Sequence, residues 1–210
     1  MARPQSEEYD ARKERILDTS ARIFADAGFH GASINQIARA CHISKSLIYH
    51  YYPSKQAILY HAMIDYVTLL REVAKKRMQA RGTAEEKLTA IVTDFLEIYE
   101  HSASRHIVLL NELDSLTDTE KQEVITLQDD VVHIFADLAD AISPAPLGEY
   151  RAKSAIAMLL MGMINWTYTW FKPGGAVDRD ALPRIIMTLF LNGLKQLDTA
   201  ALTPADGDTA

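Results

Sequence analysis

Residues 33–55 read Ser-Ile-Asn-Gln-Ile-Ala-Arg-Ala-Cys-His-Ile-Ser-Lys-Ser-Leu-Ile-Tyr-His-Tyr-Tyr-Pro-Ser-Lys, and this stretch is the most informative part of the 210-residue chain. Ser33 and Gln36 have the spacing of an N-terminal capping box, and apolar residues follow along one helical face. Ser44 is the next cap residue, and Pro53 with Ser54 ends one helix and opens another. The stretch therefore predicts two short helices joined by a tight turn, which is the spacing of a helix-turn-helix DNA-binding motif.

The second short helix divides into an apolar and a polar side. At about 100° per residue, Ile48, Tyr51 and Tyr52 fall together on one side. Ser46 and His50 point the opposite way and offer a hydroxyl and an imidazole, which suit base edges and phosphates in a major groove. A helical hairpin with an ordinary solvated face is the alternative interpretation of the same spacing.

Charge is distributed unevenly along the chain. Residues 1–60 hold eight Lys/Arg and six Asp/Glu, a net of +2, whereas the remainder holds 14 and 22, a net of −8. This asymmetry supports a DNA-facing N-terminal part on an acidic body. Lys55 lies in the first turn of the next helix, where backbone amides favour a phosphate.

Cysteine content and hydropathy bound the compartment. Cys41 is the single cysteine and lies on the apolar side of its helix, so we expect a core residue in a reducing compartment. The N-terminus is too polar for a signal peptide. The most apolar run, residues 155–171, is interrupted by polar residues and lies at the short limit for a membrane span. We expect a cytoplasmic protein with no membrane partner.

Helical patterns account for nearly the whole chain, with no strand signal and no internal repeat. The sequence predicts an all-α fold of about nine helices, located near 8–28, 33–52 (the two-helix hairpin), 54–80, 83–101, 104–113, 117–142, 149–171 and 180–198. Two further capping boxes, Thr83 to Glu86 and Thr117 to Glu120, open helices. We expect a DNA-binding domain over 1–55, a ligand-binding and dimerisation domain over 56–200 and a flexible tail over 201–210.

The last two long helices are apolar on more than one side, so each needs a cover beyond its own core. Pairing them across a two-fold axis would give a four-helix dimer interface. The residues expected in this interface are Leu159, Gly162, Ile186, Phe190 and Gly193. Packing entirely within a monomer core is the alternative.

Residues 11–60 resemble the DNA-binding head of the tetracycline-repressor (TetR) family of bacterial regulators. The similarity is carried by residues 44–55, by Ile37-Ala38 and by the Gly28-Phe29 exit from the first helix. It implies a homodimeric, ligand-controlled transcriptional repressor that binds a palindromic double-stranded DNA operator and is not an enzyme. Carried onto matching positions, it implies DNA contacts from Ser33, Ser44, Lys45, Ser46, Leu47, Tyr49, His50, Tyr51 and Lys55.

This sequence departs from the family pattern at the turn and on the polar side of the second short helix. His42 stands where the family often has Gly, at a turn that favours a left-handed backbone. Ser46 and Leu47 stand where the family often has a small residue and Thr. The operator sequence therefore cannot be transferred from a relative.

Residues 162–171, followed by Lys-Pro-Gly-Gly, resemble the subgroup that controls fatty-acid, sterol or aromatic-acid catabolism. The resemblance implies a hydrophobic or acyl-CoA-like effector and no resident cofactor. The candidate effector-binding residues combine apolar side chains with groups for a polar or anionic end, and they are Phe95, Tyr99, Arg105, Leu109, Leu113, Met158, Met161, Asn165 and Trp166. Core packing or a solvated charge is the alternative for each.

Two other classes of protein compete with this interpretation. A metal-dependent enzyme would find its nearest ligands in Asp129, Asp130 and His133, which share one helical side, although a solvated acidic face explains the same spacing. We expect no metal site. A helical adaptor that binds only protein is the second competitor, and the salt dependence of DNA binding separates it from a regulator.

Overall fold

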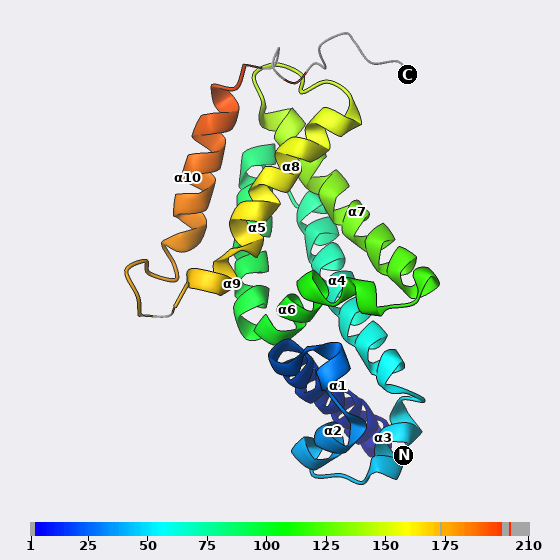
Figure 1. Ribbon diagram of the computed structural model, residues 1–210. Helices are drawn as coiled ribbons and strands as arrows, with labels where there is room; N and C mark the ends of the chain where they lie inside the picture. Colours follow the sequence, from blue (N-terminus) through cyan, green and yellow to red (C-terminus); the bar gives the residue numbers. More distant parts are fainter. Residues whose placement is uncertain (1–2, 173, 199–201, 203–210) are drawn as a thin grey trace. The chain divides into compact units, whose positions relative to one another are not determined.

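The computed structural model describes residues 3–172, 174–198 and 202. Within these ranges the secondary structure is helical without any strand, which confirms the all-α prediction. In chain order the elements are α1 (Arg3–Gly31), α2 (Ile34–Cys41), α3 (Lys45–Tyr51), α4 (Lys55–Gln79), α5 (Ala84–His101), α6 (Ala103–Asn111), the 3₁₀ turn η1 (Leu113–Ser115), α7 (Asp118–Ile142), α8 (Tyr150–Asn165), α9 (Thr167–Trp170) and α10 (Leu182–Lys195) (Figure 1). Most of the expected flexible tail, residue 201 and residues 203–210, lies outside the described residues.

The chain forms two compact units. The first comprises Met1–Leu69 and His101–Leu127, and the second comprises Leu70–Glu100 and Gln128–Ala210. The first unit therefore contains α1, α2, α3 and the first part of α4, together with α6, η1 and the first part of α7. A division of the sequence into domains at residue 55 stays a prediction.

The core of the first unit is built by apolar faces of α1, α2, α3 and α4. Ile16, Phe24, Ile37, Ile48 and Ile58 are all buried there. The helical path of α1 is interrupted at Gly28, whose φ of +71° favours a residue without a Cβ. The first helix thus ends its regular course at the predicted glycine, and a further short helical turn runs to Gly31 before α2.

The predicted caps of the helix-turn-helix are present. The Ser33 hydroxyl accepts a hydrogen bond from the Gln36 amide while the Gln36 side chain accepts one from the Ser33 amide, which completes the capping box. The Ser44 hydroxyl accepts from the Leu47 amide at 3.1 Å and starts α3. Between the two helices His42 is left-handed, with φ 55° and ψ 41°. These caps explain why both helices begin where the sequence predicts.

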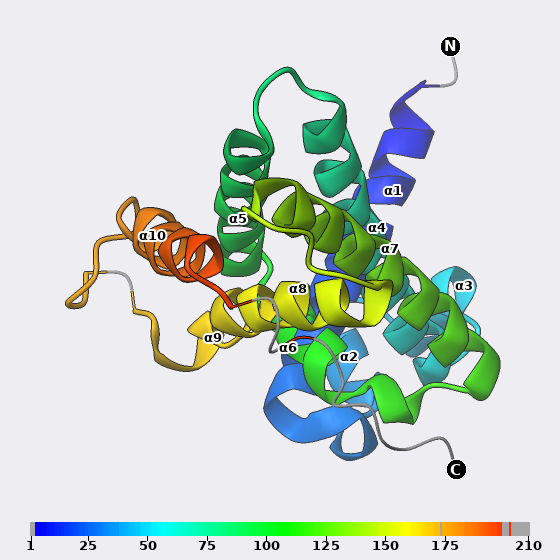
Figure 2. The same ribbon diagram turned by 90° about the horizontal axis from the view of Figure 1, so that it is seen from above.

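The second unit places α5, the later part of α7, α8 and α10 around an apolar interior (Figures 1 and 2). The rings of Phe95 on α5 and Phe135 on α7 lie 5.6 Å apart, and both side chains are buried. The Lys195 ammonium of α10 contacts the Glu85 carboxylate of α5 at 2.7 Å. The capping box from Thr83 to Glu86, predicted at the start of α5, is also present.

The structure corrects the prediction of one continuous helix over 149–171. The helix stops at Asn165, and the four residues of α9 follow after Trp166. The Thr167 hydroxyl donates to the Ile164 carbonyl, and the Thr169 amide donates to Trp166 three residues back instead of four. Such local hydrogen bonds compete with the regular helical pattern and break it. Across the described residues, none of the helices combines the length and the apolar character that crossing a membrane requires.

The left-handed backbone of His42 gives a stability prediction. A residue with a Cβ is strained there by about 1 kcal/mol, whereas glycine is not. We expect His42→Gly to raise the free energy of unfolding by up to about 1 kcal/mol and His42→Val to lower it by about as much. Urea unfolding at one fixed protein concentration measures both, and a glycine variant less stable than the parent would contradict the assigned turn.

Candidate DNA-binding surface and effector-binding residues

Helix α3 buries one side and exposes the other, as its sequence predicts. Ile48 and Tyr52 are 0% and 1% exposed and pack into the first unit. Ser46, Tyr49 and His50 are exposed, and Tyr51 is half-buried between the two sides. The hydroxyl, phenol and imidazole groups therefore form an outward surface on a helix of seven residues, anchored by an aromatic and aliphatic underside.

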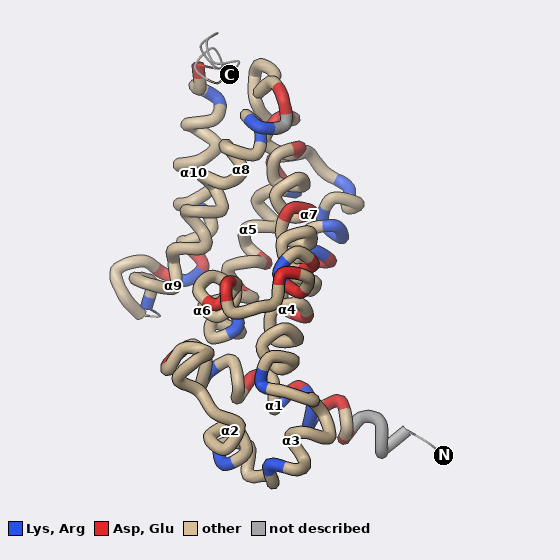
Figure 3. Tube along the Cα trace, turned by 45° about the vertical axis from the view of Figure 1, so that its right-hand side comes forward, with Lys and Arg blue, Asp and Glu red and all other residues tan. Residues whose placement is uncertain are grey.

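Helices α2 and α3 carry basic side chains and contain no carboxylate. No Asp or Glu occurs between Asp26 and Asp65, a stretch that contains all of α2 and α3 and that carries Arg39, Lys45 and Lys55. Figure 3 accordingly shows α2 and α3 with basic but no acidic segments. The absence of carboxylates removes local repulsion toward a phosphate backbone, even though the net charge of the chain is −6.

The other predicted DNA-contact residues differ in the interactions that their side chains make within the protein. Ser33 and Ser44 are exposed at helix N-termini, and both hydroxyls serve as caps. Lys45 is exposed with its ammonium 5.8 Å from the centre of the Tyr49 ring, and Leu47 is half-buried. Capping leaves both serines at the helix ends where backbone amides can also face a phosphate.

Lys55 has a structural role that the sequence did not indicate. Its ammonium donates to the carbonyls of Phe29 and Ala32 at 2.7 and 2.8 Å and lies 4.2 Å from the centre of the Phe29 ring. Three interactions with the turn between α1 and α2 hold the ammonium partly buried. A phosphate contact from Lys55 stays a prediction. In the structure, the Lys55 side chain holds the start of α4 against this turn.

Within the first unit, α6 contacts the turn between α1 and α2, whereas η1 and the start of α7 contact the first part of α4. The Glu112 carboxylate accepts a hydrogen bond from the Phe29 amide at 3.1 Å, next to the kink at Gly28. The side-chain amide of Gln56 donates to the Ser115 carbonyl at 2.9 Å. The Tyr60 hydroxyl donates to the Glu123 carboxylate, and this hydrogen bond together with burial raises the pKa of Tyr60 to about 12. Sequence reasoning missed these residues because only the fold brings them together.

Arg105, predicted to meet an anionic effector, is occupied by two carboxylates of α1. Its guanidinium contacts Glu14 at 2.5 Å and Asp18 at 2.9 Å, and the residue is 8% exposed. The structure therefore assigns it to the attachment of α6 to α1. Leu109 is buried and Leu113 half-buried, both in the same unit.

In the second unit, two of the candidate effector residues form a polar pair inside an apolar cluster. The Tyr99 hydroxyl donates to the Asn165 side-chain oxygen at 2.8 Å, and the Phe95 ring lies 6.0 Å from that of Tyr99. Burial raises the pKa of Tyr99, so the phenol remains a neutral donor. Met161 is half-buried, whereas Met158 and Trp166 are exposed on the surface of the unit.

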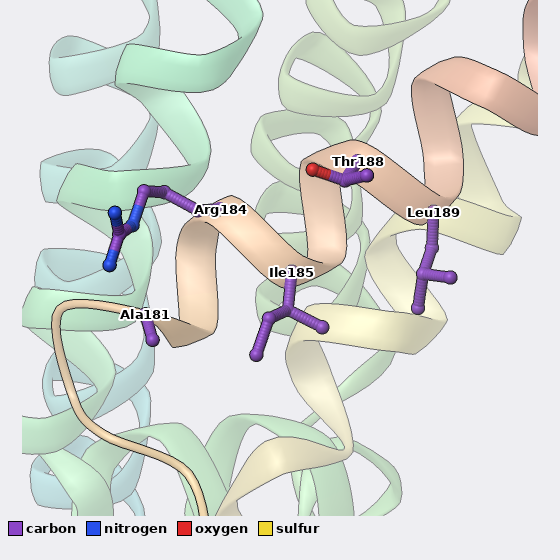
Figure 4. Close-up of a pocket in the computed structure, with 5 residues that line it drawn as sticks. All are labelled: Ala181, Arg184, Ile185, Thr188 and Leu189. Atoms are coloured by element: carbon purple, nitrogen blue, oxygen red, sulfur yellow. The ribbon is translucent and has the colours of Figure 1, made fainter.

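Helices α8, α9 and α10 carry an exposed apolar face, which we call the α8–α10 face. It is formed by Met158, Leu159, Trp166, Trp170, Ile185 and Leu189. An open hollow of about 300 Å³ on α10 lies within it, lined by Ala181, Arg184, Ile185, Thr188 and Leu189 (Figure 4). Gly162 and Gly193 are exposed as well, and a Cβ added to either would meet no atom within 4 Å.

Two of the interface residues predicted on α10 are largely buried within the single chain, and their part in a dimer interface stays a prediction. Ile186 and Phe190 are 5% and 9% exposed within a single chain, so both belong to the core of the second unit. Their neighbours Ile185 and Leu189, at 44% and 62%, point outward instead. On a helix that is apolar on adjoining sides, periodicity does not tell which side faces inward.

The acidic residues of α7 that a metal enzyme would require have other partners. The Asp130 carboxylate lies 3.5 Å from the Arg71 guanidinium and 3.6 Å from the Lys75 ammonium. The His133 ring nitrogen Nδ1 contacts the Asp129 carbonyl of its own helix. Over the part of the chain that the structure describes, no group of three potential metal ligands comes together.

Two family models match this chain. Residues 16–62 match the model described as "Bacterial regulatory proteins, tetR family", and residues 81–194 match the one described as "Tetracyclin repressor-like, C-terminal domain". The first contains α2 and α3, and the second extends from the start of α5 into α10. The family assignment thus rests on both parts of the sequence.

Proteins similar to this chain support the same family assignment as the two family models. A TetR-family transcriptional regulator from Bordetella parapertussis 12822 is 36% identical in structure-based alignment, with a TM-score of 0.81, over 88% of this chain and 96% of that one. AibR, solved with isovaleryl coenzyme A and operator DNA, is 25% identical with a TM-score of 0.74, over 85% and 97%. The repressor KstR2 of Mycolicibacterium smegmatis is 21% identical over 89% of this chain and 92% of its own length. This chain therefore belongs to the TetR family of helix-turn-helix transcriptional repressors.

Proposed function

We propose that this protein acts in the cytoplasm as a homodimeric repressor that reads a roughly palindromic operator and is released from it by a small hydrophobic or acyl-CoA-like effector. The observation that carries the proposal is the outward polar surface of α3. Ser46, Tyr49 and His50 are exposed over a buried Ile48 and Tyr52. Such a helix enters a major groove, and a dimer reads two half-sites about one helical turn apart or more.

Dimerisation through the α8–α10 face is supported by its apolar character. Leu159 is 66% exposed and Leu189 is 62% exposed, and large side chains rarely gather at a free surface without a partner. Gly162 and Gly193 lower helix stability where they stand, by about 1 kcal/mol each. Close approach of a second copy offsets that cost, because two such helix pairs can pack as a four-helix bundle.

The effector class is supported by one relative and by the chemistry of the second unit. AibR, which is similar over most of this chain, binds isovaleryl coenzyme A according to its crystal structure. Phe95, Tyr99 and Asn165 combine an apolar wall with a polar pair, a combination that suits an acyl chain next to a thioester carbonyl. Arg105 would reach an anionic group only by leaving Glu14 and Asp18.

In this mechanism the effector prefers a state in which the two DNA-binding heads are wrongly spaced. Helix α4 runs without interruption from Lys55, at the turn of the head, to Gln79 in the second unit, and would carry the shift. A 1,000-fold weakening of operator binding requires about 4 kcal/mol of differential affinity, which two effector molecules per dimer can supply.

The DNA-reading role of α3 predicts different effects for two neighbouring side chains. Tyr49→Ala should weaken binding to a duplex selected by the parent protein from a random-sequence library by roughly 10-fold. Lys45→Ala should lower the slope of log affinity against log salt by about one, for selected and scrambled duplexes alike. Fluorescence anisotropy measures both. Loss of folding in Tyr49→Ala would assign the side chain to the core. If the parent protein's affinity for the duplex did not depend on salt, a helical adaptor that binds only protein would be favoured instead.

The proposed dimer is tested by placing a charge on its face. Leu189→Glu should convert the protein to a monomer with unchanged helix content, because a buried carboxylate without a partner strongly opposes association. Leu69→Glu, at a leucine of α4 that is 46% exposed, is the matched control and should leave the dimer intact. Sedimentation velocity distinguishes the two. A dimeric Leu189→Glu variant would place the interface elsewhere.

The effector class is tested by release from the selected duplex. A panel of acyl-CoA thioesters of increasing chain length should contain members that dissociate the complex, whereas free coenzyme A and the free fatty acids should not. Native mass spectrometry of the same samples should show two bound ligands per dimer. If no thioester binds or releases the DNA, the proposed effector class is wrong, while the operator-binding proposal stands.

A further inference from the structure

Tyr9, near the start of α1, lies against the C-terminal end of α3. Its ring centre is 4.7 Å from that of Tyr51 at an angle of 33°, and 6.5 Å from that of His50 at 86°. The His50 and Tyr51 rings are themselves 5.5 Å apart, edge to face. Three aromatic side chains from two helices thus form one cluster within the first unit.

The position of the cluster is significant because α3 is short. Seven residues give a helix little stability of its own, and His50 and Tyr51 occupy its last turn. Ile48 and Tyr52 are buried on the inner side of the helix, whereas His50 lies on its exposed side. Tyr9 supplies a contact from outside the helix-turn-helix that orients the exposed rings.

The local structure of α1 fits this role. Arg12 pairs with Glu8 one turn away at 2.6 Å, which supports the helix on either side of Tyr9. The Lys13 ammonium lies 5.9 Å from the centre of the Tyr52 ring, so a second residue of α1 lies close to the C-terminal end of α3. Tyr9 itself is 41% exposed, and core packing alone does not explain its placement.

We propose that Tyr9 is a positioning residue for operator recognition, which holds the rings of Tyr51 and His50 in the orientation that meets DNA. The proposal rests on the DNA-reading role proposed above for α3. Tyr9 acts through its ring, because aromatic pairs at this distance restrict each other's orientation. It therefore contributes to the discrimination between operator and other sequences, and not to the non-specific attraction that depends on charge.

The first test is a comparison of Tyr9→Ala with the matched control Tyr9→Phe. With the selected duplex, Tyr9→Ala should bind about 3- to 10-fold more weakly, whereas Tyr9→Phe should bind like the parent. Affinity for a scrambled duplex and its salt slope should be unchanged in both. Equal weakening by both substitutions would overturn the proposal in favour of a direct contact from the Tyr9 hydroxyl, and an unchanged Tyr9→Ala would overturn it outright.

A double-mutant cycle separates positioning from a purely structural effect. If Tyr9 acts through Tyr51 and His50, changing both tyrosines to alanine should weaken binding by less than the sum of the two single losses in binding free energy. Full additivity of the two losses would contradict the proposal.

In NMR spectra of the protein without DNA, the ring-proton resonances of His50 should shift in Tyr9→Ala and keep their chemical shifts in Tyr9→Phe. Failure of the parent protein to retain any duplex would instead remove the proposed function, an outcome distinct from each of these.

Discussion

Burial of Ile48 and Tyr52 beneath a helix of only seven residues orients the candidate DNA-binding surface. Such a helix does not persist by its own hydrogen bonds, so its underside must be fixed by the first unit. Once these two side chains are buried, helical periodicity leaves Ser46 and His50 outward. The outward polar surface of α3 is thus a consequence of hydrophobic packing, and the polar residues proposed to read DNA contribute little to their own placement.

The surroundings of that helix supply the attachments that packing alone does not. Lys55 fastens α4 to the carbonyls at the end of α1, and Glu112 holds the Phe29 amide beside the kink at Gly28. Arg105 adds a pair of carboxylate contacts between α6 and α1. A movement of α6 or α4 would therefore displace the start of the helix-turn-helix. In the proposed mechanism, these contacts would carry a displacement of α4 or α6 to the helix-turn-helix.

Sequence patterns predicted most helix boundaries because the boundaries depend on local chemistry. The capping boxes at Ser33, Thr83 and Thr117 and the Ser44 cap are all present. Long-range partners were not predictable: nothing near Arg105 or Lys55 in the sequence indicates the carboxylates and carbonyls that hold them. The same limit explains Ile186, because an apolar helix does not reveal which of its sides faces inward. Tyr9 lay in a polar stretch with no pattern at all.

The polar side of α3 is proposed to face base edges in a major groove, and a crystal structure of the intact protein bound to its selected duplex would show whether it does. We expect two copies on one duplex, each with Ser46, Tyr49 and His50 within hydrogen-bond or van der Waals distance of base edges or phosphates, and Ile48 still buried. A complex in which α3 lies away from the DNA, or in which another helix occupies the groove, would contradict it.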